Sequence, residues 1–331
     1  MSEQQKIGQF IKSIREARGM TQEEFAKSLR TSQSAVARME SGNQNFTTQV
    51  LEKVSRVLGR RIIAMTDSID FRIEGGKKLH GSIATNASKN GALGVLSAAL
   101  LNRGKTVLHG IPRIEEVNRF VEVLDSIGFH VEWIDQNSVS IVPPKKIHMK
   151  GLNGASAGKI RSVLMLMGGL IHYEKAFRFP HAGGCKMGQR TIAAHRYGLE
   201  DLGVKIITHE NEYEIKVGSL HGADITLYEA SDTATENLLI AAARIPATTT
   251  ISFATPNYQV QDVCFFLEKM GVRIEGIGTS NLTIHGVADI NMPVEYHNSE
   301  DPIESMMFLS AAITTHSQLT VTRCPIEFIK L

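Results

Sequence analysis

TVLHGIPRIEEVNRFVEVLDSIGFHVE at residues 106–132 and TISFATPNYQVQDVCFFLEKMGVRIE at residues 250–275 share one order of features, which decides the fold of most of this chain. Each begins with strand-forming residues, turns at a proline, continues in an amphipathic helical pattern and reaches a glycine before a second strand. A longer third copy, with an inserted glycine-rich loop, occupies residues 175–206, and a fourth begins at residue 320. Repetition at a period of about 70 residues predicts a body built from one α/β unit.

A helical segment of small apolar residues precedes each copy. Helices that are apolar on several faces are buried on several faces. We therefore expect these helices to pack together inside each lobe, with the strands in outer sheets. Lobe A is expected at about residues 88–228, and lobe B at about residues 68–87 plus 229–331. The four segments are Asn90–Leu101, Ile160–Ile171, Thr235–Ala243 and Ile303–Ile313.

Residues 1–67 are expected to form a separate all-α domain. Thr21 precedes Gln-Glu-Glu, which is the pattern of a capping box at a helix start, and Gly42 is a stop signal after a later helix. The run GMTQEEFAKSLRTSQSAVARMESG at residues 19–42 resembles the phage-repressor-like helix-turn-helix family. Apolar residues at helical spacing predict the core: Ile7, Phe10, Ile11, Ile14, Phe25, Ala26, Leu29, Val36, Met39, Leu51, Val54 and Leu58.

This resemblance implies that the second helix of the motif reads bases in a DNA major groove. Its exposed side would carry Gln33, Ser34 and Arg38, since Gln pairs with adenine and Arg with guanine, while Gln22 would bind a phosphate. Readers of this class bind paired half-sites, so a homodimer is implied. The alternative is a structural domain that only dimerises the protein.

Length and composition set the broad class. At 331 residues the chain exceeds the size that a single core usually serves, about 250–300 residues, and its net charge of +2 marks it neither as a general nucleic-acid binder nor as a membrane binder. It shows neither a secretory signal nor a membrane-spanning run, which predicts a cytoplasmic protein. Cys185, Cys264 and Cys324 form no CxxC pair, so neither a disulfide framework nor a zinc site is supported.

Basic residues stand at the starts of two of the apolar helices. Lys89 opens the first, and Lys159 and Arg161 open the second. A cation is unfavourable at the positive end of a helix dipole, so the repeated placement indicates that an anion is recruited there. A solvated helix end is the alternative for any one of these residues.

The third copy contains the loop PHAGGCKMGQR at residues 180–190. Its glycines let the backbone approach a ligand, and Lys186 and Arg190 favour a thiolate at Cys185, which could serve as an acid or a nucleophile. Cys264, in contrast, lies on the apolar face of VCFFLEKM and is predicted to be core.

Five segments together resemble the enolpyruvyl transferase family, in particular its members that act on UDP-N-acetylglucosamine in peptidoglycan precursor synthesis. The resemblance implies inside-out α/β barrel lobes and transfer of the enolpyruvyl group of phosphoenolpyruvate to the 3′-hydroxyl of the sugar nucleotide, in a cleft that closes over substrate. It implies no metal or organic cofactor. The segments are FRIEGGKKLHGSIATNASKNGAL (71–93), GKIRSVLMLMGGL (158–170), GGCKMGQR (183–190), TATENLLIAAA (233–243) and EDPIESMMF (300–308).

The same resemblance implies the site residues. Cys185 would protonate the methylene carbon and is the position that fosfomycin alkylates in the family. Lys89 and Arg190 would grip phosphoenolpyruvate, and Asp301 would accept the hydroxyl proton. The implied contacts to the sugar nucleotide and other charged positions are Asn90, Arg161, Thr191, Ile192, Ala193, Ala194, Ser231, Asp232 and Thr233.

The family body has six repeats, whereas this chain ends in the fourth. We therefore expect an incomplete second lobe with an open strand edge and a partly exposed core, in either a truncated protein or a degenerate relative. Two functions fit: an enolpyruvyl transferase that carries a DNA-binding domain, or a transcription regulator whose inactive body senses a sugar nucleotide.

Overall fold

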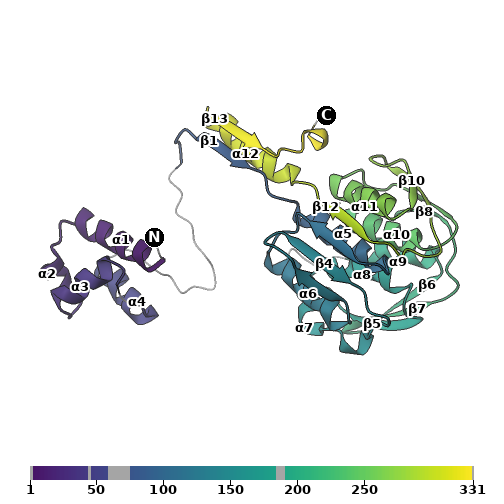
Figure 1. Cartoon of the computed structure of the whole chain (residues 1–331), viewed down its shortest axis with the longest axis horizontal. Coiled ribbons are helices and arrows are strands. Elements are labelled where there is room, and N and C mark those ends of the chain that lie inside the picture. The colour runs from purple at the N-terminus through teal and green to yellow at the C-terminus, as the bar shows by residue number, and fades with distance from the viewer. Residues whose placement is uncertain (1–2, 44–45, 59–74, 184–190, 330–331) are drawn as a thin grey trace. The chain divides into compact units, whose positions relative to one another are not determined.

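The computed structural model describes residues 3–43, 46–58, 75–183 and 191–329. The chain divides into two compact units, Met1–Gly76 and Lys77–Leu331, both drawn in Figure 1. The boundary expected at residue 67 falls within residues 59–74, outside the described part of the chain. No described helix combines the length and apolarity that crossing a membrane requires.

The first unit is built from helices α1 (Glu3–Ala17), α2 (Gln22–Ser28), α3 (Gln33–Glu40) and α4 (Thr48–Val57). The capping box predicted at Thr21 is present, because Thr21 accepts from the Glu24 N–H and the Glu24 carboxylate accepts from the Thr21 N–H. Phe10 was predicted to be core but is 47% exposed, since it lies at the edge of the face of α1 that is buried. The buried core is Ile11, Ile14, Phe25, Ala26, Leu29, Val36, Met39, Leu51, Val54 and Leu58.

A buried ion pair joins α1 to α3. Arg15 Nε lies 2.5 Å from Glu40 Oε1, and Arg15 Nη2 lies 3.0 Å from Glu40 Oε2. The two side chains are 7% and 3% exposed. Such a two-pronged contact fixes orientation as well as distance, so it holds α3 at a set position on α1.

The second unit repeats a strand–helix–strand–strand pattern, as the sequence predicts. The first copy is β2 (Thr106–His109), α6 (Glu115–Ser126), β3 (His130–Trp133) and β4 (Ser138–Val142). The second is β5 (Ala176–Pro180), α9 (Ala193–Asp201), β6 (Val204–Thr208) and β7 (Glu212–Val217). The third is β9 (Thr248–Ser252), α11 (Tyr258–Lys269), β10 (Arg273–Glu275) and β11 (Asn281–His285).

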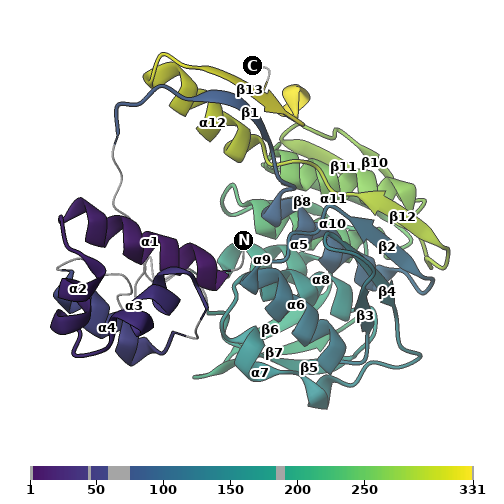
Figure 2. The ribbon, with the colours of Figure 1, turned by 60° about the vertical axis from the view of Figure 1, so that its left-hand side comes forward.

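Apolar helices fill the interior of this unit. They are α5 (Lys89–Ala98) with its 3-10 extension η1 (Ala99–Leu101), η3 (Ser162–Met165) with α8 (Leu166–Leu170), and α10 (Asp232–Ala243). Every residue of α10 from Ala234 onward is buried. α5 and α10 both contact α11, and α10 also contacts α8. Figure 2 shows these helices inside the body with the sheets toward its outside, as expected for an inside-out arrangement.

Three sheets surround the helices, with strand orders β12-β2-β4-β3, β5-β7-β6 and β8-β9-β11-β10. The additional strands are β8 (Asp224–Thr226) and β12 (Val294–His297), which pair in parallel with β9 and β2. Since β12 follows the third copy and pairs with the first, the three copies close on one another. The remaining short helices are η2 (Met149–Gly151), α7 (Gly154–Ala157) and η4 (Ile326–Phe328).

The body is not divided near residue 228, where the boundary between lobes A and B was expected. One hydrophobic core runs from Ala92 to Val294 and contains side chains of α5, α8, α10 and α11. The physical reason is that three helices, apolar on nearly every face, bury one another only when all three copies share a core.

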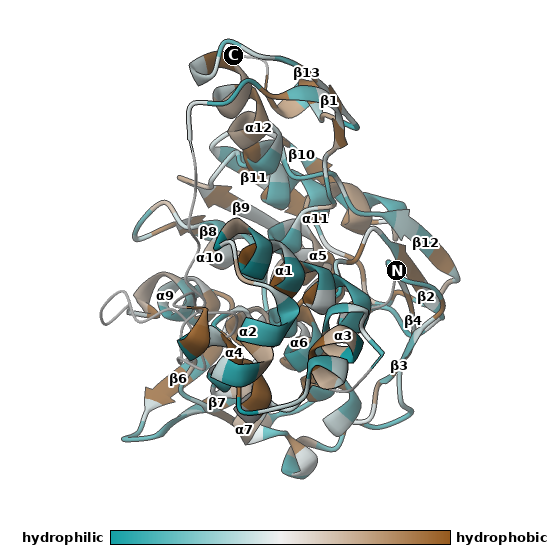
Figure 3. Cartoon of the chain, turned by 90° about the vertical axis from the view of Figure 1, so that its left-hand side faces the viewer, coloured by the Kyte–Doolittle hydropathy of each residue, from teal (hydrophilic) through white to brown (hydrophobic). Residues whose placement is uncertain are grey.

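The start of a further lobe consists of β1 (His80–Ala84), α12 (Pro302–Thr314) and β13 (Gln318–Thr322). β1 and β13 pair in parallel although some 240 residues separate them along the chain. Figure 3 shows α12 beside these strands, with hydrophobic residues in brown among them. α12 was predicted to be buried, yet Ile303 is 63% and Ile313 is 73% exposed, because the described residues supply no further helix to cover it.

Candidate active site

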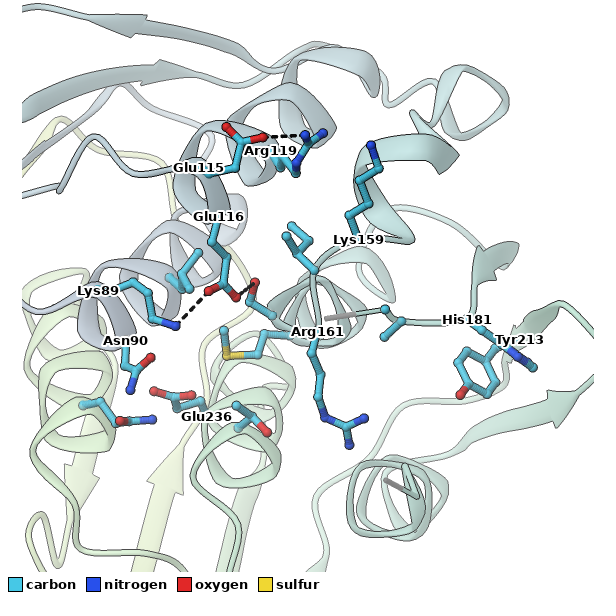
Figure 4. Close-up of a pocket in the computed structure, with 18 of the residues that line it drawn as sticks. Lys89, Asn90, Glu115, Glu116, Arg119, Lys159, Arg161, His181, Tyr213 and Glu236 are labelled. Carbon is cyan, nitrogen blue, oxygen red and sulfur yellow. Dashed lines mark hydrogen bonds and ion pairs between the residues drawn. The ribbon is translucent and has the colours of Figure 1, made fainter. Parts of the chain in front are cut away.

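A cleft of about 1090 Å³ opens in the second unit. Figure 4 shows that its walls come from distant parts of the chain, among them the start of α5, the residues before η3, the end of β5 and α10. Of the residues that the sequence implicates, it is lined by Lys89, Asn90, Arg161, Thr191 and Thr233. The fold thus brings together groups that the repeats place in separate copies.

Lys89 follows the N-cap of α5, where the Ser88 hydroxyl accepts from the Gly91 N–H at 3.1 Å. The Lys89 ammonium lies 2.8 Å from Oε2 of Glu116, on α6. Glu116 Oε1 also accepts from Ser162 Oγ at 3.1 Å. The anion that holds this cation in the structure is therefore a carboxylate of the protein, a partner that the sequence analysis missed.

Arg161 stands at the opposite wall, where Nη2 donates to the Thr191 carbonyl at 2.8 Å. This bond ties the start of η3 to the segment that leads into α9. Lys159 lines the same cleft. Lys89 and Arg119 line it as well, so the described residues give the cleft four cations suited to an anionic ligand.

Only the ends of the loop predicted to carry the reactive thiol belong to the described residues. Cys185 and Arg190 fall in residues 184–190, outside the described residues. Gly183 and Thr191, which flank that segment, both line the cleft. A Cβ on Gly183 would stand 1.8 Å from the Gly158 carbonyl oxygen, so glycine is required where the chain enters the segment.

The residues after the loop divide between cleft and core. Ile192 and Ala194 are buried at 7% and 3% exposure, so their side chains serve packing, and Ala193 is the first residue of α9. Thr191 is the residue of this stretch that lines the cleft.

At the start of α10, Ser231 is the N-cap and accepts from the Ala234 N–H at 3.3 Å. Asp232 accepts from Asn257 Nδ2 at 3.1 Å. Thr233 faces the cleft, and its hydroxyl lies 3.2 Å from Nε2 of His195. The segment is therefore fixed by its own cap and by α9 and α11.

His195 is a buried, uncharged support behind the cleft. Burial, and secondarily the charge of Arg161, lowers its pKa to about 3. Asn237 Nδ2 donates to His195 Nδ1 at 3.1 Å, and the orientation of that amide is set by the Gly168 N–H, 2.7 Å from Asn237 Oδ1. His195 Nε2 then carries the proton that is donated to Thr233.

Glu236 lines the cleft from α10 and is fully buried. Burial, followed by the charges of Asp232 and Asp262, raises the pKa of this carboxyl well above its usual value. The sequence analysis did not single it out, although a lone acidic residue within the apolar run TATENLLIAAA was a usable signal.

Asp301 borders a second hollow of about 380 Å³ together with Lys89. Asp301 is the N-cap of α12, and its Oδ1 accepts from the N–H groups of Ile303 (2.8 Å) and Glu304 (3.3 Å). Lys89 lines both hollows. Lys89 and Asp301, which the sequence analysis assigned to one active site, therefore both line this second hollow.

In the first unit, Gln33, Ser34 and Arg38 are exposed on α3. Gln22, expected to bind a phosphate, is half-buried, and its Nε2 donates to Glu40 Oε2 at 2.9 Å. The described residues contain no cluster of three or more His, Cys, Asp and Glu side chains placed to hold a metal ion. Cys264 is fully buried, and burial raises the pKa of its thiol, as predicted for a core residue.

Comparison with family models gives two matches. Residues 73–330 match the model described as EPSP synthase (3-phosphoshikimate 1-carboxyvinyltransferase). Residues 11–63 match the model described as helix-turn-helix. The second match begins within α1 and includes α2, α3 and α4, and the first includes the repeat body.

Curated relatives are named UDP-N-acetylglucosamine 1-carboxyvinyltransferase. The protein of Bradyrhizobium diazoefficiens is 35% identical over 262 residues, which cover 79% of this chain and 60% of that protein. The protein of Treponema denticola is 35% identical over 253 residues, covering 76% of this chain and 59% of the relative. The chain thus spans about 60% of the length of these relatives.

Solved structures share the fold. The enolpyruvyl transferase NikO from Streptomyces tendae superposes with a TM-score of 0.60 at 19% identity, over 72% of this chain and 56% of NikO. EPSP synthase from Acinetobacter baumannii gives a TM-score of 0.55 at 19% identity, over 71% of this chain and 53% of that chain.

Proposed function

Because the chain belongs to the EPSP synthase family, we propose that its body transfers the enolpyruvyl group of phosphoenolpyruvate to the 3′-hydroxyl of UDP-N-acetylglucosamine and releases phosphate. The names of relatives at about 35% identity support this acceptor. Such a product belongs to peptidoglycan precursor synthesis.

The observation that carries the proposal is the convergence of Lys89, Asn90, Arg161 and Thr233 on one cleft. The cleft volume of about 1090 Å³ suits a ligand the size of a sugar nucleotide with a small second substrate. Cations at the walls favour substrates that carry phosphate and carboxylate groups.

The two proton transfers of the addition step each have a candidate group. The acceptor oxygen forms a bond to C2 of phosphoenolpyruvate while Asp301 takes the hydroxyl proton and Cys185 delivers a proton to the methylene carbon. Loss of phosphate and of one methyl proton restores the double bond. Both capping bonds of Asp301 go to Oδ1, so Oδ2 is the oxygen available to the substrate.

The proposed substrate-binding roles are assigned to residues that line the cleft or belong to the segments beside it. Lys89 and Arg190 would hold phosphoenolpyruvate, with Arg161 as a further cation. Asn90 would contact the sugar, while residues 191–194 and 231–233 would contact the uridine and the diphosphate. The described ends of the Cys185 loop, Gly183 and Thr191, support its placement here because both line the cleft.

The test measures phosphate release from phosphoenolpyruvate plus UDP-N-acetylglucosamine, with Cys185→Ala as the comparison. We expect release by the wild type, a loss of at least a hundredfold in the variant, and a fosfomycin adduct on the wild type alone by mass spectrometry. Absence of both release and sugar-nucleotide binding in the wild type would remove the proposal.

We propose that the first unit binds DNA as a homodimer through the exposed face of α3, with Gln33, Ser34 and Arg38 toward base edges. The helix-turn-helix match over residues 11–63 supports this role. Light scattering in solution tests the dimer, and a gel shift at low salt tests DNA binding. A chain that shifts no DNA would have a first unit that only dimerises.

A regulator without turnover is the second candidate. It is favoured by the presence of a helix-turn-helix on the same chain and by the ion pair that occupies Lys89 in the structure. Binding of the sugar nucleotide without phosphate release, together with a ligand-dependent change in DNA affinity, would select it over the enzyme.

A further inference from the structure

Glu236 is a polar side chain buried at the cleft. Its exposed fraction is zero, and within the described residues neither Oε1 nor Oε2 has a hydrogen-bond partner. An unpaired buried polar group is costly, so proteins rarely retain one unless a ligand or water completes it. Because Glu236 lines the cleft, a ligand bound there would lie against it.

The fold leaves space for this carboxyl. A Cβ on Gly94 of α5 would stand 3.0 Å from Glu236 Oε1 and 2.6 Å from Cγ2 of Val263. A larger residue at position 94 would therefore press on the carboxyl from behind. The glycine lets Glu236 approach the α5 backbone closely.

Two uncharged amide side chains share the cleft with Glu236. Asn90 of α5 and Gln259 of α11 line the same cleft, and Gln259 is 5% exposed. Figure 4 shows the Glu236 carboxyl and Asn90 directed toward the same part of the cleft. An amide, like a protonated carboxyl, offers both a donor and an acceptor.

Protonation makes Glu236 a donor as well as an acceptor. Burial raises the pKa of Glu236, and Asp232 and Asp262 add to the effect. The cations of the cleft, in contrast, favour the ionised form. The titratable groups around it are Asp232 on its own helix, Asp262, Tyr258 and Cys264 on α11, Lys89 on α5, and Arg161 before η3.

We propose that Glu236 is a specificity-determining residue that binds an uncharged hydroxyl or amide of the acceptor sugar, donating through its O–H and accepting through its carbonyl oxygen. Asn90 and Gln259 add further uncharged polar groups to this part of the cleft. The anionic parts of the substrates bind Lys89 and Arg161 instead. This assignment rests on the proposed transfer to a sugar nucleotide.

The test is a calorimetric titration of the full chain with UDP-N-acetylglucosamine and, separately, with phosphoenolpyruvate. Glu236→Gln keeps a donor and an acceptor, so its affinity for the sugar nucleotide should stay within threefold of wild type. Glu236→Leu removes the carboxyl group, and Glu236→Asp moves it back by one methylene. We expect both variants to bind the sugar nucleotide at least tenfold more weakly. Affinity for phosphoenolpyruvate should change less than threefold in all three.

Thermal unfolding verifies that each variant is folded, and Glu236→Asp keeps the test decisive if the leucine variant is not. Glu268→Gln, on the exposed side of α11, is the control and should bind as wild type does. Wild-type affinity for the sugar nucleotide in Glu236→Leu and Glu236→Asp would overturn the inference and leave the proposed function intact. So would a loss confined to phosphoenolpyruvate. A wild type that binds no UDP-N-acetylglucosamine would overturn both.

Discussion

The Lys89 ammonium lies 2.8 Å from the Glu116 carboxylate, so the cation that we propose as a receptor for a substrate anion is already paired inside the protein. The side chains are 41% and 29% exposed, which keeps this ion pair within reach of water and weak in net energy. An incoming anion must compete with Glu116 for the same ammonium.

Replacing Glu116 by Gln should therefore strengthen anion binding. A partly exposed pair is worth about 0.5–1 kcal/mol, which corresponds to a gain of about two- to fivefold in affinity for phosphoenolpyruvate. Titration calorimetry at low salt measures it, with Glu132→Gln on the exposed side of β3 as control. Weaker binding in the Glu116 variant would mean that the carboxylate positions Lys89 rather than competing for it.

The buried carboxyl of Glu236 should make the second unit less stable as pH rises. Its pKa in the folded state is raised above the usual value, so between the two pKa values the folded state binds one more proton than the unfolded state. The free energy of unfolding then falls by up to about 1.4 kcal/mol for each pH unit. Urea unfolding, followed by the fluorescence of Trp133, should show a flatter profile in Glu236→Gln. Parallel profiles would mean that Glu236 is already ionised.

His195 should act in the opposite direction at acid pH. Its pKa falls from 6.5 to about 3 on folding, so the unfolded state binds more protons between these values. Stability is complete above pH 6.5 and is lost as pH falls toward 3, by up to about 1.4 kcal/mol for each pH unit. We expect His195→Asn to lower stability at pH 8, because packing is lost, and to reduce this acid dependence. An unchanged slope between pH 6.5 and 4 would assign it to other groups.

Breaking the buried Arg15–Glu40 ion pair should strongly destabilise the first unit. Glu40→Ala leaves the Arg15 guanidinium buried without its carboxylate partner, at a cost of about 3–5 kcal/mol. Replacing both residues by Met should cost less, since no charge remains unpaired. Amide hydrogen exchange in α1–α3 reports on this unit alone. Equal losses in the single and double variants would show that leaving the guanidinium unpaired adds no cost of its own.

Arg38→Ala should weaken binding to a selected DNA sequence by about 1–3 kcal/mol and relax preference at one base position. Fluorescence anisotropy at fixed salt measures both effects. Lys269→Ala, in the last turn of α11 and outside the first unit, is the matched loss of a positive charge and should leave binding unchanged. A uniform loss over all sequences would assign Arg38 to a phosphate contact.

The sequence predicted the repeat body because each copy carries its own local signals, and the observed copies follow the same element order. It also predicted an anion site near Lys89 and Arg161 from their places at helix starts, and both residues line the cleft. The contact of Glu116 with Lys89 could not be predicted, because a glutamate on an amphipathic helix is typical of its solvent-exposed face. Its pairing with Lys89 depends on how α6 packs near α5, which no local pattern encodes.

The division into lobes was not predictable in the same way. Helices that are apolar on all faces, such as α10, must be buried, but the pattern does not say which neighbours bury them. α12 has the same pattern and remains exposed at Ile303 and Ile313. Hydrophobicity thus indicates that a segment requires burial. The tertiary contacts available to the segment decide whether it becomes buried.

Two short connections join β1, α12 and β13 to the rest of their unit, at residues 85–88 and 298–301. They are bonded to each other, Ser88 N to Ser299 O at 2.8 Å and Asp301 N to Asn86 O at 2.9 Å, which makes them one double-stranded connection. Lys89 directly follows its first strand and Asp301 ends its second. The ammonium and the carboxylate are therefore spaced by paired backbone, whereas the far end of α12 is attached to the rest of the unit only through this connection.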